Sequence, residues 1–139
     1  MLMGIIAESC KESMAKNMNE AMQTACRGVI DNHTRVRYAG LSCLALLLTE
    51  LAPKAQKKFH AELMPVLLTM MNKEALIKMQ THAVSTVINF ANGLHSVSED
   101  DEEETAQSHQ DIIKIYSSTL FETLITLLKK AIDTNYEPL

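Results

Sequence analysis

An apolar pattern that recurs after 43 residues constrains the fold of this 139-residue chain more than any other feature. Within residues 33–51, five apolar or small residues follow one another at spacings of four, four, three and four, and these spacings return within residues 76–94. Such spacings place the residues on one face of a helix. The two sets are Val36, Gly40, Leu44, Leu47 and Leu51, and Met79, Ala83, Val87, Phe90 and Leu94. We call these two predicted helices B helices. A partial third copy, Met3, Ile6 and Cys10, stands at the start of the chain.

A second kind of predicted helix, the A helix, alternates with the B helices. Its apolar residues form three sets related by offsets of 42 and 57 residues. They are Ala21, Met22, Ala25, Cys26 and Val29; Leu63, Met64, Leu67, Leu68 and Met71; and Leu120, Phe121, Leu124, Ile125 and Leu128. The longer offset indicates an insertion of 15 residues into a regular array. Pro53 is expected to break the chain between repeats, and Pro65 either to kink its A helix or to mark a later start near Glu62.

The composition agrees with a helical fold, since aromatic residues make up only 4% of the chain and there are few glycines and prolines. Helix pairs that recur every 40-odd residues are typical of HEAT or armadillo repeats, which bury their faces by stacking. We therefore predict an all-α, right-handed α-solenoid of HEAT repeats in the order B-A-B-A-B-loop-A. The expected parts are repeats in 1–94, an acidic inserted loop in 95–108 and the first helix of a further repeat in 109–139. The half repeats predict a fragment of a longer solenoid, with apolar surface exposed at both ends.

The formal net charge of −4 comes from one short segment. Six consecutive acidic residues stand in the inserted loop: Glu99, Asp100, Asp101, Glu102, Glu103 and Glu104. Like charges repel and bury nothing, so we expect this loop to be disordered. The rest of the chain is nearly neutral and lacks the basic stripe that binding to a phosphate backbone requires. Nucleic acid is therefore not an expected direct partner.

No catalytic, metal-binding or membrane-spanning motif stands out. The chain has no glycine-rich phosphate loop, no paired Cys-x-x-Cys and no His-Glu-x-x-His, so we expect neither an enzyme nor a cofactor. Cys10, Cys26 and Cys43 are expected to be small buried hydrophobes of a reducing compartment. The apolar stretches are too short for a bilayer and the N-terminus is unlike a signal peptide, so we expect no membrane contact.

Four segments carry a resemblance to a known family. They are Asp31–Ala39 (DNHTRVRYA), Gln56–His60 (QKKFH), Gln80–Ala83 (QTHA) and Val87–Phe90 (VINF). Together they resemble the importin-β (karyopherin-β) family of nuclear transport receptors, and in particular its importin-5 or karyopherin-β3 branch. The resemblance covers residues 1 to about 94. The chain departs from the family's pattern at Asn32, where the family has proline, and at Gln80, which stands where the previous repeat has Arg37.

Asp31 and Arg37 have an expected structural role. An Asp in the turn before a B helix can cap that helix, and an Arg six residues later points towards the neighbouring repeat, where charge-assisted hydrogen bonds can tie adjacent turns together. A direct contact with cargo is the alternative for both residues.

The B helices also carry a row of residues about half a turn from their core stripe. It contains Ile5 and Glu8; Tyr38, Ser42, Leu46 and Thr49; and Thr81, Ser85, Asn89 and Asn92. The resemblance implies that this row, with Glu50 beside it, lies on the concave surface where receptors of the family hold cargo or Ran. Its carboxylates, amides and hydroxyls could receive a basic import signal. An ordinary solvated helix face is the alternative.

The resemblance further implies a protein of cytoplasm and nucleus whose full-length form binds basic cargo, Ran-GTP and nucleoporins. The acidic loop could attract basic cargo, could contact Ran, or could be a flexible spacer. The alternative class is a HEAT-repeat interaction scaffold of the phosphatase-subunit or coat-adaptor type.

Overall fold

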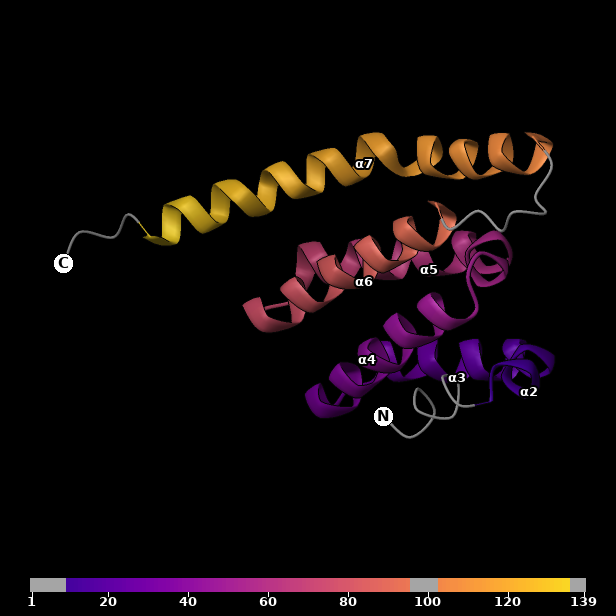
Figure 1. The fold of residues 1–139 in the computed structure, drawn as a ribbon. Coiled ribbons are helices and arrows are strands. Elements are labelled where there is room, and N and C mark those ends of the chain that lie inside the picture. Colours follow the sequence, from indigo (N-terminus) through magenta and orange to yellow (C-terminus); the bar gives the residue numbers. More distant parts are fainter. Residues whose placement is uncertain (1–9, 96–102, 136–139) are drawn as a thin grey trace.

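The computed structural model describes residues 10–95 and 103–135, all of whose regular elements are helices (Figure 1). In chain order they are α2 (Lys11–Lys16), α3 (Met18–Val29), α4 (Thr34–Glu50), α5 (Lys54–Lys73), α6 (Ile77–His95) and α7 (Glu103–Asn135). The prediction of an all-α protein is confirmed. The partial B copy at residues 3–9, which includes Glu8, lies outside the described residues.

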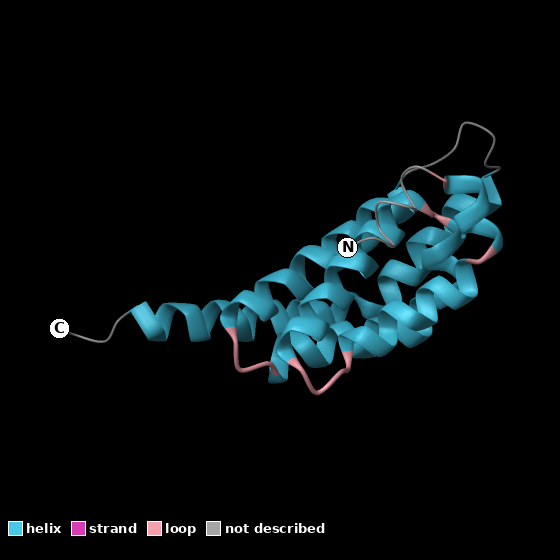
Figure 2. Cartoon of the chain, turned by 90° about the horizontal axis from the view of Figure 1, so that it is seen from below, coloured by secondary structure: helices cyan, strands magenta, loops and turns pink. Residues whose placement is uncertain are grey.

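The helices form two layers. The B helices α4 and α6 pack side by side, while the A helices α3, α5 and α7 make the other layer (Figures 1 and 2). Within each repeat α3 pairs with α4 and α5 pairs with α6, and α7 lies along α5. Tyr116 on α7 donates a hydrogen bond of 3.2 Å to the carbonyl of His60 on α5. From α3 to α7 the predicted alternation of A and B helices and the stacked-repeat architecture are therefore confirmed, whereas the short helix α2 was not predicted.

The core is built from the predicted stripes. Every member of the two complete B stripes is buried except Val36, which lies in the first turn of α4 and is 42% exposed. In α3 and α5 the A stripes are buried, with Cys26 and Leu68 packed against the edge of the core. These stripes face one another between the two layers, so helix packing rather than local propensity fixes the register.

Helices α3 and α4 approach closely at two glycines. A Cβ on Gly40 would lie 2.6 Å from both the carbonyl carbon of Gly28 and the backbone nitrogen of Val29. Contacts this short between such atoms are repulsive, so the absence of a side chain allows the two backbones to meet. The glycine at position 40 of the first B stripe is therefore required by the packing of this pair.

Two boundaries differ from the prediction. Helix α7 begins at Glu103, so residues 103–108 are helical and do not belong to the predicted loop of 95–108, and His95 ends α6. Glu, Ala and Gln are strong helix formers, and the segment extends α7 by propensity. Helix α5 runs from Lys54 through Pro65, so the later start near Glu62 is wrong. Pro65 is exposed, and buried residues on both sides of it hold the helix together.

The three cysteines lie in different environments. Cys43 is buried, Cys26 is half-buried and Cys10 is exposed, and all three are free thiols. Burial raises the pKa of the Cys26 and Cys43 thiols, which favours their protonated form. The expectation of a buried residue is therefore wrong for Cys10, which precedes α2 instead of lying within a packed helix.

Candidate protein-binding surfaces

The predicted row of residues on the B helices forms one exposed surface, which we call the B face. Tyr38, Thr49, Thr81, Ser85 and Asn92 are exposed, while Ser42, Glu50 and Asn89 are half-buried. Leu46, on the same face, is 37% exposed. Because α4 and α6 are packed neighbours, the residues of both helices belong to a continuous surface. The structure does not describe the side chain of Glu8.

The Ser and Thr hydroxyl groups of the B face all make the same kind of hydrogen bond. Ser42, Thr49, Thr81 and Ser85 each donate to the carbonyl four residues earlier in their own helix, at 3.0 to 3.1 Å. A hydroxyl that has donated its only proton retains oxygen lone pairs, so it is an acceptor towards any partner. These four hydroxyls and the carboxylate of Glu50 are therefore acceptors on the B face, and acceptors suit the N–H groups of Lys and Arg.

A cluster of side chains crosses from α4 to α6 on the B face. The Tyr38 ring stacks on His82 with centroids 4.8 Å apart, and the Lys78 ammonium lies 5.4 Å from the Tyr38 ring centroid. Ser42 Oγ is 3.0 Å from His82 Nε2. Because the Ser42 proton goes to the Tyr38 carbonyl, His82 Nε2 must be the donor in this contact. Burial lowers the pKa of His82, which favours the neutral ring.

His82 and Lys78 were not among the predicted site residues. The sequence shows His82 only as a histidine within a B helix, and its partner Ser42 is 40 residues away. Ser42 and His82 are separated by nearly one repeat length, and this spacing could have predicted that they lie side by side on neighbouring B helices.

Arg37 links the first repeat to the second at the edge of the B face. Its Nε and Nη2 donate to the Glu74 carboxylate at 3.1 and 3.4 Å, and its Nη1 donates to the carbonyls of Asp31 and Asn32. Glu74 follows the last residue of α5. Arg37 therefore both closes the turn before α4 and reaches the neighbouring repeat, and Glu74 is the partner that sequence reasoning missed.

Asp31 does not cap α4. The residue at the start of that helix is His33, whose side chain accepts a hydrogen bond from the backbone N–H of Arg35. The Asp31 carboxylate instead accepts from the backbone N–H of His33 at 2.7 Å. Asp31 is two residues too early to reach the first free amides of the helix, so it stabilises the turn and leaves the capping to His33.

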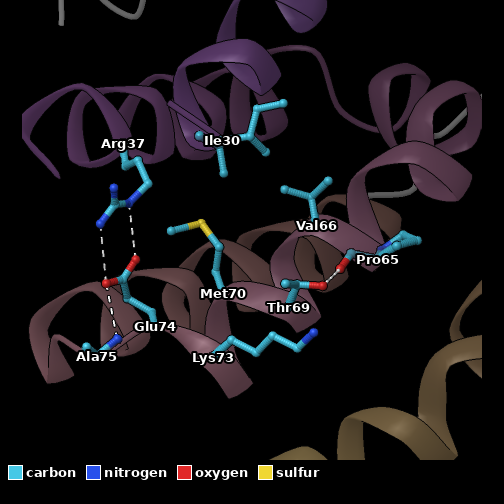
Figure 3. A pocket seen from close by; sticks show the side chains of 10 residues that line it. Ile30, Arg37, Pro65, Val66, Thr69, Met70, Lys73, Glu74 and Ala75 are labelled. Atoms are coloured by element: carbon cyan, nitrogen blue, oxygen red, sulfur yellow. Dashed lines mark hydrogen bonds and ion pairs between the residues drawn. The ribbon is translucent and has the colours of Figure 1, made fainter. Parts of the chain in front are cut away.

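A groove opens between α3 and α5 on the A-helix side (Figure 3). It encloses about 510 Å³. Ile30 lies on one side, Val66 and Met70 lie on the other, and the Arg37–Glu74 pair closes one end. Its walls are mostly apolar, and Ile30 is 66% exposed. No sequence pattern predicts this groove, because it depends on the distance between two A helices.

Only the last two residues of the acidic run lie within the described part of the chain. Glu99, Asp100, Asp101 and Glu102 lie outside the described residues, and Glu103 and Glu104 are the first residues of α7.

Within the described ranges, no group of three or more His, Cys, Asp or Glu side chains could hold a metal ion. No helix of those ranges is long and apolar enough to span a bilayer.

The chain is similar in sequence to a known transport protein. No family model matches the chain. The chain is 23% identical over 129 residues to Importin subunit beta-3 of Saccharomyces cerevisiae. The match covers 93% of this chain and 11% of that protein. At this identity the comparison supports an importin-β-like HEAT protein, and it does not distinguish the importin-5 branch.

Proposed function

We propose that this chain is a segment of an importin-β-type nuclear transport receptor and that its B face binds a basic segment of protein cargo. The observation that carries the proposal is the similarity to an importin subunit along 93% of the chain, combined with the two-layer stack of helix pairs. A stacked-repeat protein binds partners along extended surfaces. The chain spans 11% of that relative, so cargo binding, Ran-GTP binding and shuttling between cytoplasm and nucleus are proposals about the whole protein.

The chemistry of the B face supports a basic partner. Four of its hydroxyls have already donated their protons and Glu50 adds a carboxylate, so these groups are acceptors for the N–H groups of Lys and Arg, while Lys78 is a cation of the same face. Exposed Tyr38 and Leu46 provide apolar contact for the stems of Lys and Arg side chains. Binding here would be mechanical rather than catalytic: the partner would shift the packing angle between α4 and α6.

The groove between α3 and α5 supports a second kind of partner. Its apolar walls and its volume of about 510 Å³ suit the apolar side chains of a flexible peptide, so we propose it as the surface through which the protein meets nucleoporins. The two surfaces lie on different layers, so both partners could bind at once. A HEAT scaffold of the phosphatase-subunit or coat-adaptor type is the second candidate, because it would share the architecture.

Fluorescence anisotropy with the complete 139-residue chain tests the cargo proposal. A labelled peptide rich in Lys and Arg is titrated with the wild type, Glu50→Gln and Glu62→Gln. Glu62 is an exposed residue of α5, so its variant is the matched change of charge away from the B face. Loss of a surface ion pair of about 0.5–1 kcal/mol should raise the Kd for Glu50→Gln about two- to fivefold. Glu62→Gln should leave it unchanged. Equal effects of the two variants, or no binding of the peptide, would contradict the proposal and favour a scaffold.

A further inference from the structure

The two turns that lead from an A helix to a B helix lie together at one edge of the helix stack. Residues 30–33 join α3 to α4, and residues 74–76 join α5 to α6. Arg37 connects the two turns, because it donates to the carbonyls of Asp31 and Asn32 in the first and to the Glu74 carboxylate, at 3.1 Å, in the second (Figure 3). Repeats stack through the faces of their helices and not through their turns. This edge, which we call the turn edge, therefore stays exposed in a longer stack.

The turn edge carries cations that have no carboxylate partner. Four exposed Lys and Arg side chains flank the two turns: Arg27, Arg35, Lys73 and Lys78. None of the four forms an ion pair with a described residue. The two carboxylates of the same turns are already engaged, since Asp31 accepts from the backbone N–H of His33 and Glu74 pairs with Arg37. The edge therefore presents positive charge that the fold itself does not neutralise.

Arg35 and Lys78 lie where a cation is unfavourable for its own helix. They are the second residues of α4 and α6, and the helix dipole is positive at this end. Neither first turn contains an acidic residue that would offset the charge. Arg27 and Lys73, in contrast, lie in the last turns of α3 and α5, where the dipole favours cations. An anion bound beside Arg35 and Lys78 would therefore remove an unfavourable interaction at both helices.

The Tyr38 ring lies beside both of these cations. The Lys78 ammonium is 5.4 Å from the centroid of the ring, so α6 brings this cation to α4. Arg35 precedes Tyr38 by three residues in α4, which makes the two side chains neighbours on one face of that helix. Two cations beside one ring can contact neighbouring carboxylates of a single bound segment, and a guanidinium can hold a carboxylate by two hydrogen bonds.

We propose that the turn edge binds an acidic segment of a partner protein, with Arg35 and Lys78 as its main contacts. Charge complementarity identifies the partner. Ion pairs with exposed cations are individually weak, so the segment needs several acidic side chains. A nucleic acid is less suitable, because these cations surround two short turns and do not form the long stripe that a phosphate backbone requires. The inference goes beyond the proposed function, in which the partner of the B face is basic.

Fluorescence anisotropy of a labelled glutamate-rich peptide with the complete chain at low salt tests this inference. Arg35→Gln and Lys78→Gln should each raise the Kd about two- to fivefold, which is the effect of losing one surface ion pair. Lys78→Arg keeps a cation beside the Tyr38 ring and should leave the Kd within about twofold of the wild type. Lys58→Gln, near the other end of α5, is the matched control and should leave the Kd unchanged. All three altered residues are exposed, and circular dichroism verifies that the variants fold.

A peptide that does not bind at low salt would overturn the inference, and so would equal losses for Lys58→Gln and Arg35→Gln. An oligonucleotide of equal charge that binds more tightly than the peptide, and that depends on the same two cations, would also overturn it, because the edge would then recognise phosphate. The basic peptide of the cargo test separates this inference from the proposed function. Arg35→Gln should not weaken binding of the basic peptide, so a failure at the turn edge leaves the assignment of the B face unchanged.

Discussion

The ion pair between Arg37 and Glu74 should contribute substantially to the stability of the stacked repeats. The Arg37 side chain is 20% exposed and that of Glu74 is 11% exposed. This ion pair is therefore more buried than a surface pair and less buried than a core pair. Surface pairs contribute about 0–1 kcal/mol, whereas removing one partner of a buried pair costs about 3–5 kcal/mol. Arg37→Gln also leaves the carbonyls of Asp31 and Asn32 without their donor. We expect it to lower the free energy of unfolding by about 2 kcal/mol.

Urea unfolding followed by far-ultraviolet circular dichroism measures this loss, and a double-mutant cycle with Glu74→Gln isolates the pair. The coupling energy should be about 1–2 kcal/mol and should fall at high salt. Lys114→Gln is the control, because its pair with Asp111 is 66% and 57% exposed and should contribute less than about 0.5 kcal/mol. Equal losses for Arg37→Gln and Lys114→Gln would refute the inter-repeat role.

Two further predictions concern the packing of the B helices. Gly40→Ala places a Cβ 2.6 Å from backbone atoms of α3. It should lower the free energy of unfolding by about 1–3 kcal/mol, although alanine has a helix propensity more favourable by about 1 kcal/mol. Unchanged stability in urea unfolding would contradict the close approach of the two backbones. Burial lowers the pKa of His82 in the folded protein, so folding favours the neutral ring. The contribution of His82 to the free energy of unfolding is therefore complete above the unfolded pKa of about 6.5 and is lost as the pH falls below it. The wild type should therefore lose more stability than His82→Gln between neutral and mildly acidic pH, and parallel pH curves would sink this assignment.

The B helices could be predicted closely from the sequence. Residues 33–51 and 76–94 were expected, and α4 and α6 cover Thr34–Glu50 and Ile77–His95. A long pattern with helical spacing determines which side is buried, because a helix with one apolar face has one stable orientation in a stack. Local exceptions were harder to foresee. Pro65 suggested a break, but the buried residues Leu63, Met64 and Leu67 around it keep α5 continuous.

The candidate surfaces could be predicted only in part. The exposed B face followed from helical geometry, since residues half a turn from the core stripe point away from it. The contacts between helices could not be predicted in this way. Glu74 is 37 residues from its partner Arg37 in the sequence, and His82 is 40 residues from its partner Ser42. The groove at Ile30 and Val66 depends on the spacing between α3 and α5, which no local pattern encodes.

Hydrogen–deuterium exchange with the basic peptide bound tests the central claim most directly, because it reports which helices a partner stabilises. If the B face binds basic cargo, amide exchange should slow in α4 and α6 around Ser42, Glu50 and Asn89, while α7 and the groove residues of α5 should keep their rates. Protection confined to the groove between α3 and α5, or to α7, would contradict the assignment of cargo to the B face.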